Sequence, residues 1–207
     1  MIKIMMLMLL MGLAPQAIAT PTVDKEYQLI YEKAFYECPY RSPKDVDGFL
    51  LWKLVEIEKK FNPPKKLKGM LLAAACRESG YNPKAKGDYD KKGRPRAIGI
   101  LQQWPWVARY YKIDRTEPLQ AADAWMKHIV KQLKYVKKRC KYKTPYRIWR
   151  AAWVTAIRAP KKGGRCKEES LHFRLLMKWQ KKIKKEKRDY ESHLREMESK
   201  GEYVPGC

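Results

Sequence analysis

The segment MLLAAACRESGYNP, residues 70–83, predicts a buried helix that ends on a carboxylate. Apolar and small residues occupy 70–76, so this helix can be packed on every side. Gly80 and the pair Asn82-Pro83 are typical signals for the end of a helix. We therefore expect a helix over residues 65–79, with Glu78 in its last turn.

The expected position of Glu78 favours a neutral carboxylic acid. Burial against apolar neighbours penalises the charged form, and the negative end of the helix dipole acts in the same direction. A carboxylic acid that keeps its proton at neutral pH can protonate a glycosidic oxygen. A Glu-Ser pair at a helix end is, by itself, usually exposed to solvent. Other motifs therefore have to decide whether Glu78 is a catalytic acid or a solvent-exposed side chain.

Helical periodicity continues on both sides of this segment. Apolar stripes separated by Pro and Gly predict a mainly α fold, a bundle of helices around the one that carries Glu78. Residues 84–98 are different, because this charged, turn-rich stretch has no helical period and indicates a short hairpin or an irregular excursion. The other expected helices cover residues 24–37, 45–61, about 116–136, 144–157, and a stretch that begins near 168.

The first 19 residues have the features of a secretory signal peptide. Lys3 precedes an apolar run over residues 4–13, and Ala17-Ile18-Ala19 is a typical cleavage site. The run is shorter than the roughly 20 residues of a membrane-spanning helix, and an anchoring helix is the alternative. We expect an exported protein, periplasmic or secreted.

The chain is strongly basic. Lys and Arg number 46 against 22 Asp and Glu, which gives a net charge of +24 over 207 residues. This excess indicates an anionic partner such as nucleic acid, lipid headgroups or an acidic cell-wall polymer. A hydrophobic content of 45% excludes a wholly disordered chain. The expected parts are the signal peptide 1–19, an N-terminal helical segment 20–62, a main helical domain 63–183 and a basic helical tail 184–207.

Five cysteines in an exported chain indicate disulfides and leave one cysteine over. We expect Cys140 to pair with Cys166, because they bracket one helix and its following loop, and Cys38–Cys76 is the next candidate. No cysteine pair or histidine pair has the spacing of metal ligands, so we expect no metal site.

Two motifs, taken together, resemble those of the soluble lytic transglycosylases, a family with a lysozyme-like α+β fold that is related to goose-type lysozymes. The first motif of that family is Glu-Ser followed by Gly-aromatic-Asn-Pro, which matches residues 78–83. The second is Ala-x-Gly-Leu-x-Gln followed by Pro, which matches residues 97–105 with Ile100 in the place of Leu. The resemblance covers roughly residues 65–157 and identifies 63–183 as a lysozyme-like domain.

The third motif departs from the family pattern. The family has Ala-Tyr-Asn-Ala-Gly, in which the Tyr hydroxyl bonds the catalytic carboxyl and the Asn helps to hold sugar. Trp153 and Val154 occupy those places here. Indole has an N–H and no hydroxyl, and valine makes no side-chain hydrogen bond. We expect Tyr142, Tyr146 or a residue of the 84–98 excursion to replace the Tyr, or the substrate to be oriented differently.

The resemblance implies cleavage of the β-1,4 bond between N-acetylmuramic acid and N-acetylglucosamine in peptidoglycan, without a cofactor. Glu78 would act first as acid and then as base, and a 1,6-anhydro product would form. The alternative is hydrolysis as in goose-type lysozymes, with Asp88 or Asp90 as a second carboxylate that activates water. The expected substrate-binding residues are Ser79, Tyr81, Gly99, Gln102, Gln103, Trp104 and Trp153. We expect His128, His172 and His193 to be surface or satisfied core residues without a catalytic role.

A non-catalytic cationic binding protein is the competing class. Its best support is the basic runs 134–143 and 181–188, in which aromatic residues are interleaved or adjacent. The export signal argues against nucleic acid and for an anionic envelope polymer. We favour one monomeric protein with both properties, a wall-cleaving domain whose basic surface and tail hold it on its substrate. A partner from the envelope machinery is left open.

Overall fold

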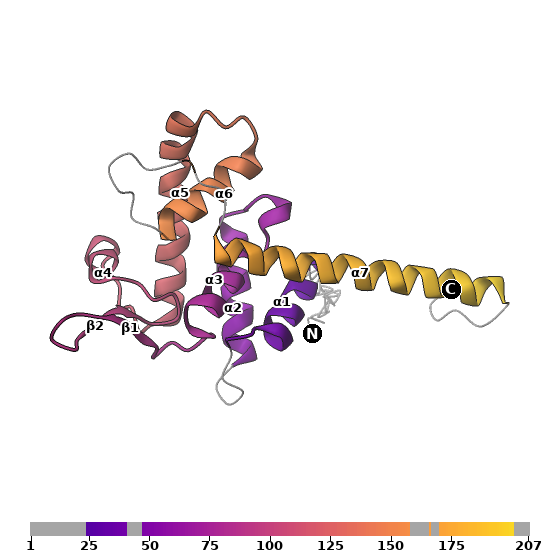
Figure 1. Ribbon diagram of the computed structural model, residues 1–207, viewed down its shortest axis with the longest axis horizontal. Helices are drawn as coiled ribbons and strands as arrows, with labels where there is room; N and C mark the ends of the chain where they lie inside the picture. Colours follow the sequence, from indigo (N-terminus) through magenta and orange to yellow (C-terminus); the bar gives the residue numbers. More distant parts are fainter. Residues whose placement is uncertain (1–23, 41–46, 158–165, 167–169, 201–207) are drawn as a thin grey trace, which may run out of the picture.

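The computed structural model describes residues 24–40, 47–157, 166 and 170–200. This part of the chain is mainly helical, as predicted, with one small two-stranded sheet (Figure 1). The expected signal peptide and Cys207 lie outside the described residues. No helix within the described ranges is both long enough and apolar enough to cross a membrane.

Two capped helices begin the described chain. α1, Lys25–Glu37, follows Asp24, and α2, Gly48–Lys60, follows Asp47. Each Asp side chain accepts a backbone N–H from the first turn of its helix, at 3.0 Å in α1 and 2.8 Å in α2, and so satisfies a donor that the helix itself leaves free. Both helices pack against α3 in one continuous core, so the segment before residue 63 is part of the same body.

The helix predicted over residues 65–79 is interrupted near its start. A 3₁₀ turn, η1, covers Lys65–Leu67, and α3 covers Met70–Ser79. Gly69 separates them with a φ of 88°, and a Cβ there would lie only 2.3 Å from Cγ2 of Ile30. The end of α3 is as predicted, because Gly80 adopts the left-handed conformation and its N–H donates to the carbonyl of Cys76 at 2.9 Å.

A buried glutamate of α2 caps the start of α3. The carboxylate of Glu58 accepts the N–H of Gly69 at 2.6 Å and that of Leu71 at 2.7 Å. Burial raises the pKa of Glu58 to about 7, although these two N–H groups favour the charged form. This cap fixes the start of the helix that ends at Glu78.

The hairpin expected within residues 84–98 is confirmed. β1, Lys86–Tyr89, pairs antiparallel with β2, Pro95–Ile98. The structure adds a helix that the sequence did not reveal, α4, Pro105–Tyr111, whose seven residues are too few for a clear apolar period. α5, Pro118–Cys140, and α6, Pro145–Ile157, then pack side by side (Figure 1).

The last described element is one long helix, α7, Leu171–Ser199. Its first half packs Leu176 and Trp179 into the core, and its second half projects away from the body (Figure 1). Ile183 is packed against the core, and the helix runs on unbroken through the predicted boundary at residue 184. Ion pairs from Lys182 to Glu37 and from Lys33 to Glu186 fasten the helix to α1.

Both expected disulfides are present. Cys140 bonds Cys166, and Cys38 bonds Cys76. The second bond joins the end of α1 to α3 two residues before Glu78. The catalytic candidate is therefore carried on a helix that is buried, capped at both ends and covalently tied.

Candidate active site

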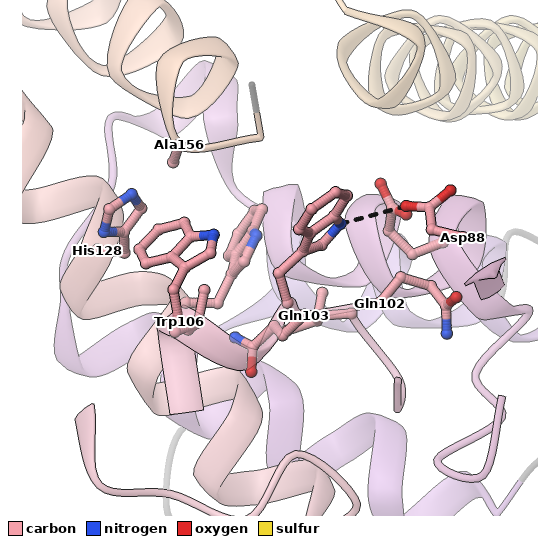
Figure 2. A pocket seen from close by; sticks show the side chains of 11 residues that line it. Asp88, Gln102, Gln103, Trp106, His128 and Ala156 are labelled. Atoms are coloured by element: carbon pink, nitrogen blue, oxygen red, sulfur yellow. Dashed lines mark hydrogen bonds between the residues drawn. The ribbon is translucent and has the colours of Figure 1, made fainter. Parts of the chain in front are cut away.

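A cleft of about 580 Å³ lies between the hairpin, α4 and the α5–α6 pair. Figure 2 shows Asp88 and Gln102 at one end of it and Trp106 and His128 at the other, with Ala156 of α6 above. The cleft is lined by residues from the end of α3, the hairpin, the loop before α4, and α4 to α6: Glu78, Asp88, Leu101, Gln102, Gln103, Trp104, Trp106, Val107, Trp125, His128 and Ala156.

Glu78 reaches this cleft from the last turn of α3. Its side chain is only 27% exposed, and its Oε1 lies 2.5 Å from Nε2 of His172. His172 belongs to the first turn of α7 and is 6% exposed. His172 is thus a buried histidine with a hydrogen-bond partner, one of the two expected placements, and the sequence did not reveal that this partner is the candidate acid.

Only one of the two aspartates proposed as a second carboxylate lines the cleft. Asp88 of β1 accepts a hydrogen bond from Nε1 of Trp104 at 3.2 Å, drawn as a dashed line in Figure 2. Asp90 instead organises the hairpin turn, where it accepts the N–H groups of Lys92 and Arg94 and pairs with the Arg94 guanidinium at 2.9 Å. These bonds, the backbone N–H of Arg94 first, lower the pKa of Asp90. Asp90 is therefore a structural residue.

Three indole side chains, Trp104, Trp106 and Trp125, form apolar walls of the cleft. Trp104 is partly exposed, and the guanidinium of Arg96 stacks on it with its carbon 4.4 Å from the ring centroid. Flat aromatic faces of this kind pack well on the apolar faces of sugar rings. The predicted role of Trp104 fits this geometry, whereas Trp125 was expected only as part of a helix core.

His128 lies at the far end of the cleft, beside Trp106. Its Nδ1 is 3.2 Å from the hydroxyl of Tyr111, and its ring meets Trp106 edge-on. Burial, with a smaller contribution from Lys131, lowers the pKa of His128. We expected His128 on the surface or in the core, and the structure gives it a half-buried place in the cleft wall.

Three residues predicted to bind substrate have structural roles instead. The hydroxyl of Ser79 donates to the carbonyl of Ile100 at 2.8 Å and ties α3 to the loop beyond the hairpin. Tyr81 is 1% exposed, and its hydroxyl donates to the backbone of α1. At Gly99 a Cβ would lie 2.0 Å from the carbonyl oxygen of Arg115, so this glycine permits a close packing of two loops and not an approach to the cleft floor.

Trp153 is also not a substrate contact. It is fully buried, with its ring edge-on to Trp125 at 6.4 Å and to Phe173 at 6.3 Å. The expected substitutes for the missing Tyr lie elsewhere too, because the Tyr142 hydroxyl donates to the carbonyl of Cys166 and Tyr146 does not line the cleft. Within the described residues, the hydrogen bond to Glu78 comes from His172.

Gln102 and Gln103 line the cleft, and their amide nitrogens are already engaged, whereas Oε1 of Gln103 is buried without a partner among the described residues. Nε2 of Gln102 donates to the carbonyls of Ala85 and Gly99, at 3.1 and 2.9 Å. Nε2 of Gln103 donates to the carbonyl of Ala121 at 2.9 Å. Both side chains therefore hold the cleft loop in place against the hairpin and α5.

Comparisons with models of protein families, with curated protein sequences and with solved structures find no match to this chain. Among the residues that the structure describes, no group of three or more His, Cys, Asp or Glu side chains could hold a metal ion. Function therefore has to be inferred from the motifs and from the geometry of the cleft.

Proposed function

We propose that the protein is a lytic transglycosylase with a lysozyme-like fold, which cleaves the β-1,4 bond between N-acetylmuramic acid and N-acetylglucosamine in peptidoglycan. One observation carries the proposal. A mostly buried carboxyl group, Glu78, opens into an aromatic-walled cleft and is held on its other side by His172. Both sequence motifs that resemble this family contribute to the lining of this cleft, the first through Glu78 and the second through Gln102 and Trp104, which supports the same proposal.

In the proposed reaction Glu78 first donates its proton to the glycosidic oxygen, and the bond from that oxygen to the anomeric carbon breaks. The N-acetyl group of the substrate stabilises the positive charge that develops. The 6-hydroxyl of the same sugar then attacks the anomeric carbon and returns its proton to the Glu78 carboxylate. The sugar product is a 1,6-anhydro ring, no water is consumed, and Glu78 regains its starting state.

The charge of the chain fits an anionic wall. The net charge is +24, and α7 carries exposed lysines at 181, 184, 185 and 187, in the middle of the helix where it leaves the body. We infer that this basic surface holds an exported, monomeric enzyme on peptidoglycan and its anionic polymers. A non-catalytic binding protein would use the same charge but would not need a carboxylic acid in an aromatic cleft.

Hydrolysis is the second candidate, and the position of Asp88 favours it. Its carboxylate shares the cleft with Glu78 and is oriented by the Trp104 N–H. A second carboxylate on the other side of the sugar could activate a water molecule, as in inverting glycosidases. Of the two aspartates that the sequence left open, Asp88 is therefore the candidate for the second carboxylate.

The mass of the products separates the three readings. Purified peptidoglycan is incubated with the wild-type protein, and the soluble muropeptides are measured by mass spectrometry, with Glu78→Gln as the control. We expect anhydro products that are one water lighter than hydrolysis products and that are absent with Glu78→Gln. Products that are heavier by one water would show hydrolysis instead. If no soluble products form but the protein binds peptidoglycan tightly, the protein is a non-catalytic binding protein.

A further inference from the structure

We propose that His172 is the positioning residue for Glu78, and that its Nε2–H donates to Oε1 and so directs the catalytic proton to Oε2. The inference rests on the proposed function, because it concerns the acid of that reaction. The contact is short, 2.5 Å between Nε2 and Oε1, and joins the last turn of α3 to the first turn of α7. Among the described residues, the hydrogen bond and the ion pair of Glu78 both involve Oε1, so the proposal leaves Oε2 to face the substrate in the cleft.

The imidazole ring is held by packing on more than one side. His172 is 6% exposed, and its ring centroid lies 6.4 Å from that of the buried Trp153. The helix that carries it is fixed at its start, because the Ser170 hydroxyl accepts the N–H of Phe173 at 3.1 Å. A ring that cannot turn keeps its hydrogen bond to Glu78 in one direction, as a catalytic acid requires.

Burial also decides which nitrogen carries the proton. Nδ1 of His172 is buried and has no hydrogen-bond partner among the described residues. Of the two tautomers, the one with its proton on Nδ1 would leave a buried N–H without an acceptor, which proteins rarely tolerate, whereas the one with its proton on Nε2 leaves only a lone pair unpaired. The Nε2–H tautomer can also donate to Glu78 both as the acid and as the carboxylate.

This arrangement explains why the third motif can lack its tyrosine. The resemblance assigns to that tyrosine hydroxyl the hydrogen bond to the catalytic carboxyl. In this chain the bond comes from a different helix, and Trp153, which stands at the tyrosine position, packs behind the histidine. In this proposal, His172 supplies the hydrogen bond that the tyrosine would make, and Trp153 fills the position of the tyrosine ring.

The kinetic test compares His172→Leu, which removes the donor, with His172→Gln, whose amide can donate from nearly the same place. The matched control is His193→Leu, a substitution of an exposed histidine on the same helix. On soluble glycan chains we expect His172→Leu to lower kcat by about 100-fold with little change in KM, since a misplaced acid mainly slows the chemical step. His172→Gln should recover at least about tenfold of that loss. Wild-type kcat in His172→Leu, or equal loss in both variants, would overturn the proposal.

A second measurement does not depend on activity or on a folded variant at position 172. Nitrogen NMR of the wild-type protein identifies the protonated nitrogen of each histidine. We expect the His172 proton on Nε2 and a clear change of that signal in Glu78→Gln. A proton on Nδ1, or a signal that ignores Glu78→Gln, would overturn the proposal. If the NMR result is as expected but the wild-type protein cleaves no peptidoglycan, the proposed function fails and the contact stands.

Discussion

At the scale of single residues, the cleft holds two carboxylates with different surroundings. Glu78 is mostly buried and bonded to a histidine, whereas Asp88 sits at the cleft rim in a hairpin strand with a φ of 48°. Asp is one of the few residues that adopt this left-handed conformation readily. Because Asp88 is the second carboxylate that lines the cleft, its role decides between the two proposed reactions.

If Glu78 acts alone, Asp88→Asn should keep the turnover within about tenfold of the wild-type value. If Asp88 is the general base of hydrolysis, the same substitution should lower the turnover by about 100-fold or more. The measurement is the rate of muropeptide release from purified peptidoglycan. Asp90→Asn is the matched control, since it changes the same hairpin outside the cleft. A near-complete loss in Asp88→Asn with normal release in Asp90→Asn would speak for hydrolysis.

The sequence alone identifies Glu78 as a candidate but not the residue that contacts it. Glu78 could be found because its neighbours in the chain form a motif and a helix end. His172 could not, because it is 94 residues away and only the packing of α7 on α3 brings it to Glu78. Ser79, Tyr81 and Gly99 share the motif with the site but serve the fold, which a pattern of residue types cannot distinguish.

At the scale of elements, most helix bounds could be predicted because Asp, Pro and Gly mark their ends. The break before α3 could not, since the left-handed Gly69 is required by contacts with α1 and by the cap from Glu58, both distant in sequence. The same cap makes the stability of this element depend on pH. Glu58 has a folded pKa of about 7, above its usual value of 4.5, so the folded state holds this proton more tightly than the unfolded state does.

The stabilisation of the folded state by Glu58 should accordingly be greatest below pH 4.5 and decrease as the pH rises to 7 and above. Between pH 5 and 8, the free energy of unfolding of the wild-type protein should fall by roughly 2–3 kcal/mol relative to that of Glu58→Gln. Chemical denaturation at each pH measures this difference. Glu56→Gln, a half-buried position on the same helix, is the control and should behave as wild type in this range, because the hydrogen bond from Lys53 lowers the pKa of Glu56. An identical pH dependence in wild type and Glu58→Gln would contradict this account of the α3 cap.

At the scale of the whole molecule, a compact body carries a long basic helix that extends beyond it (Figure 1). The sequence indicated a basic tail, and the structure makes it the second half of α7, continuous with the half that supplies His172. The helix that contacts Glu78 thus also carries exposed basic residues. We infer that binding and cleavage can be separated by substitutions in the first turn and in the middle of one helix.

Four substitutions test this separation: Lys181, Lys184, Lys185 and Lys187 to Gln. Binding to purified peptidoglycan should fall about tenfold or more at low salt and differ less from wild type at high salt, since salt screens exposed charges. Turnover of short soluble glycans should not change. The control neutralises four exposed lysines of α5, namely 127, 134, 137 and 138, and an equal loss of binding there would contradict a specific role for α7.

The most direct test of the account is the turnover of Glu78→Gln. This variant keeps the size of the side chain and an acceptor for His172 but has no proton to give to a glycosidic oxygen. With an unchanged circular dichroism spectrum, it should release almost no soluble muropeptides from peptidoglycan that the wild-type protein degrades. Release at the wild-type rate by folded Glu78→Gln would contradict the claim that this carboxyl group is the catalytic acid.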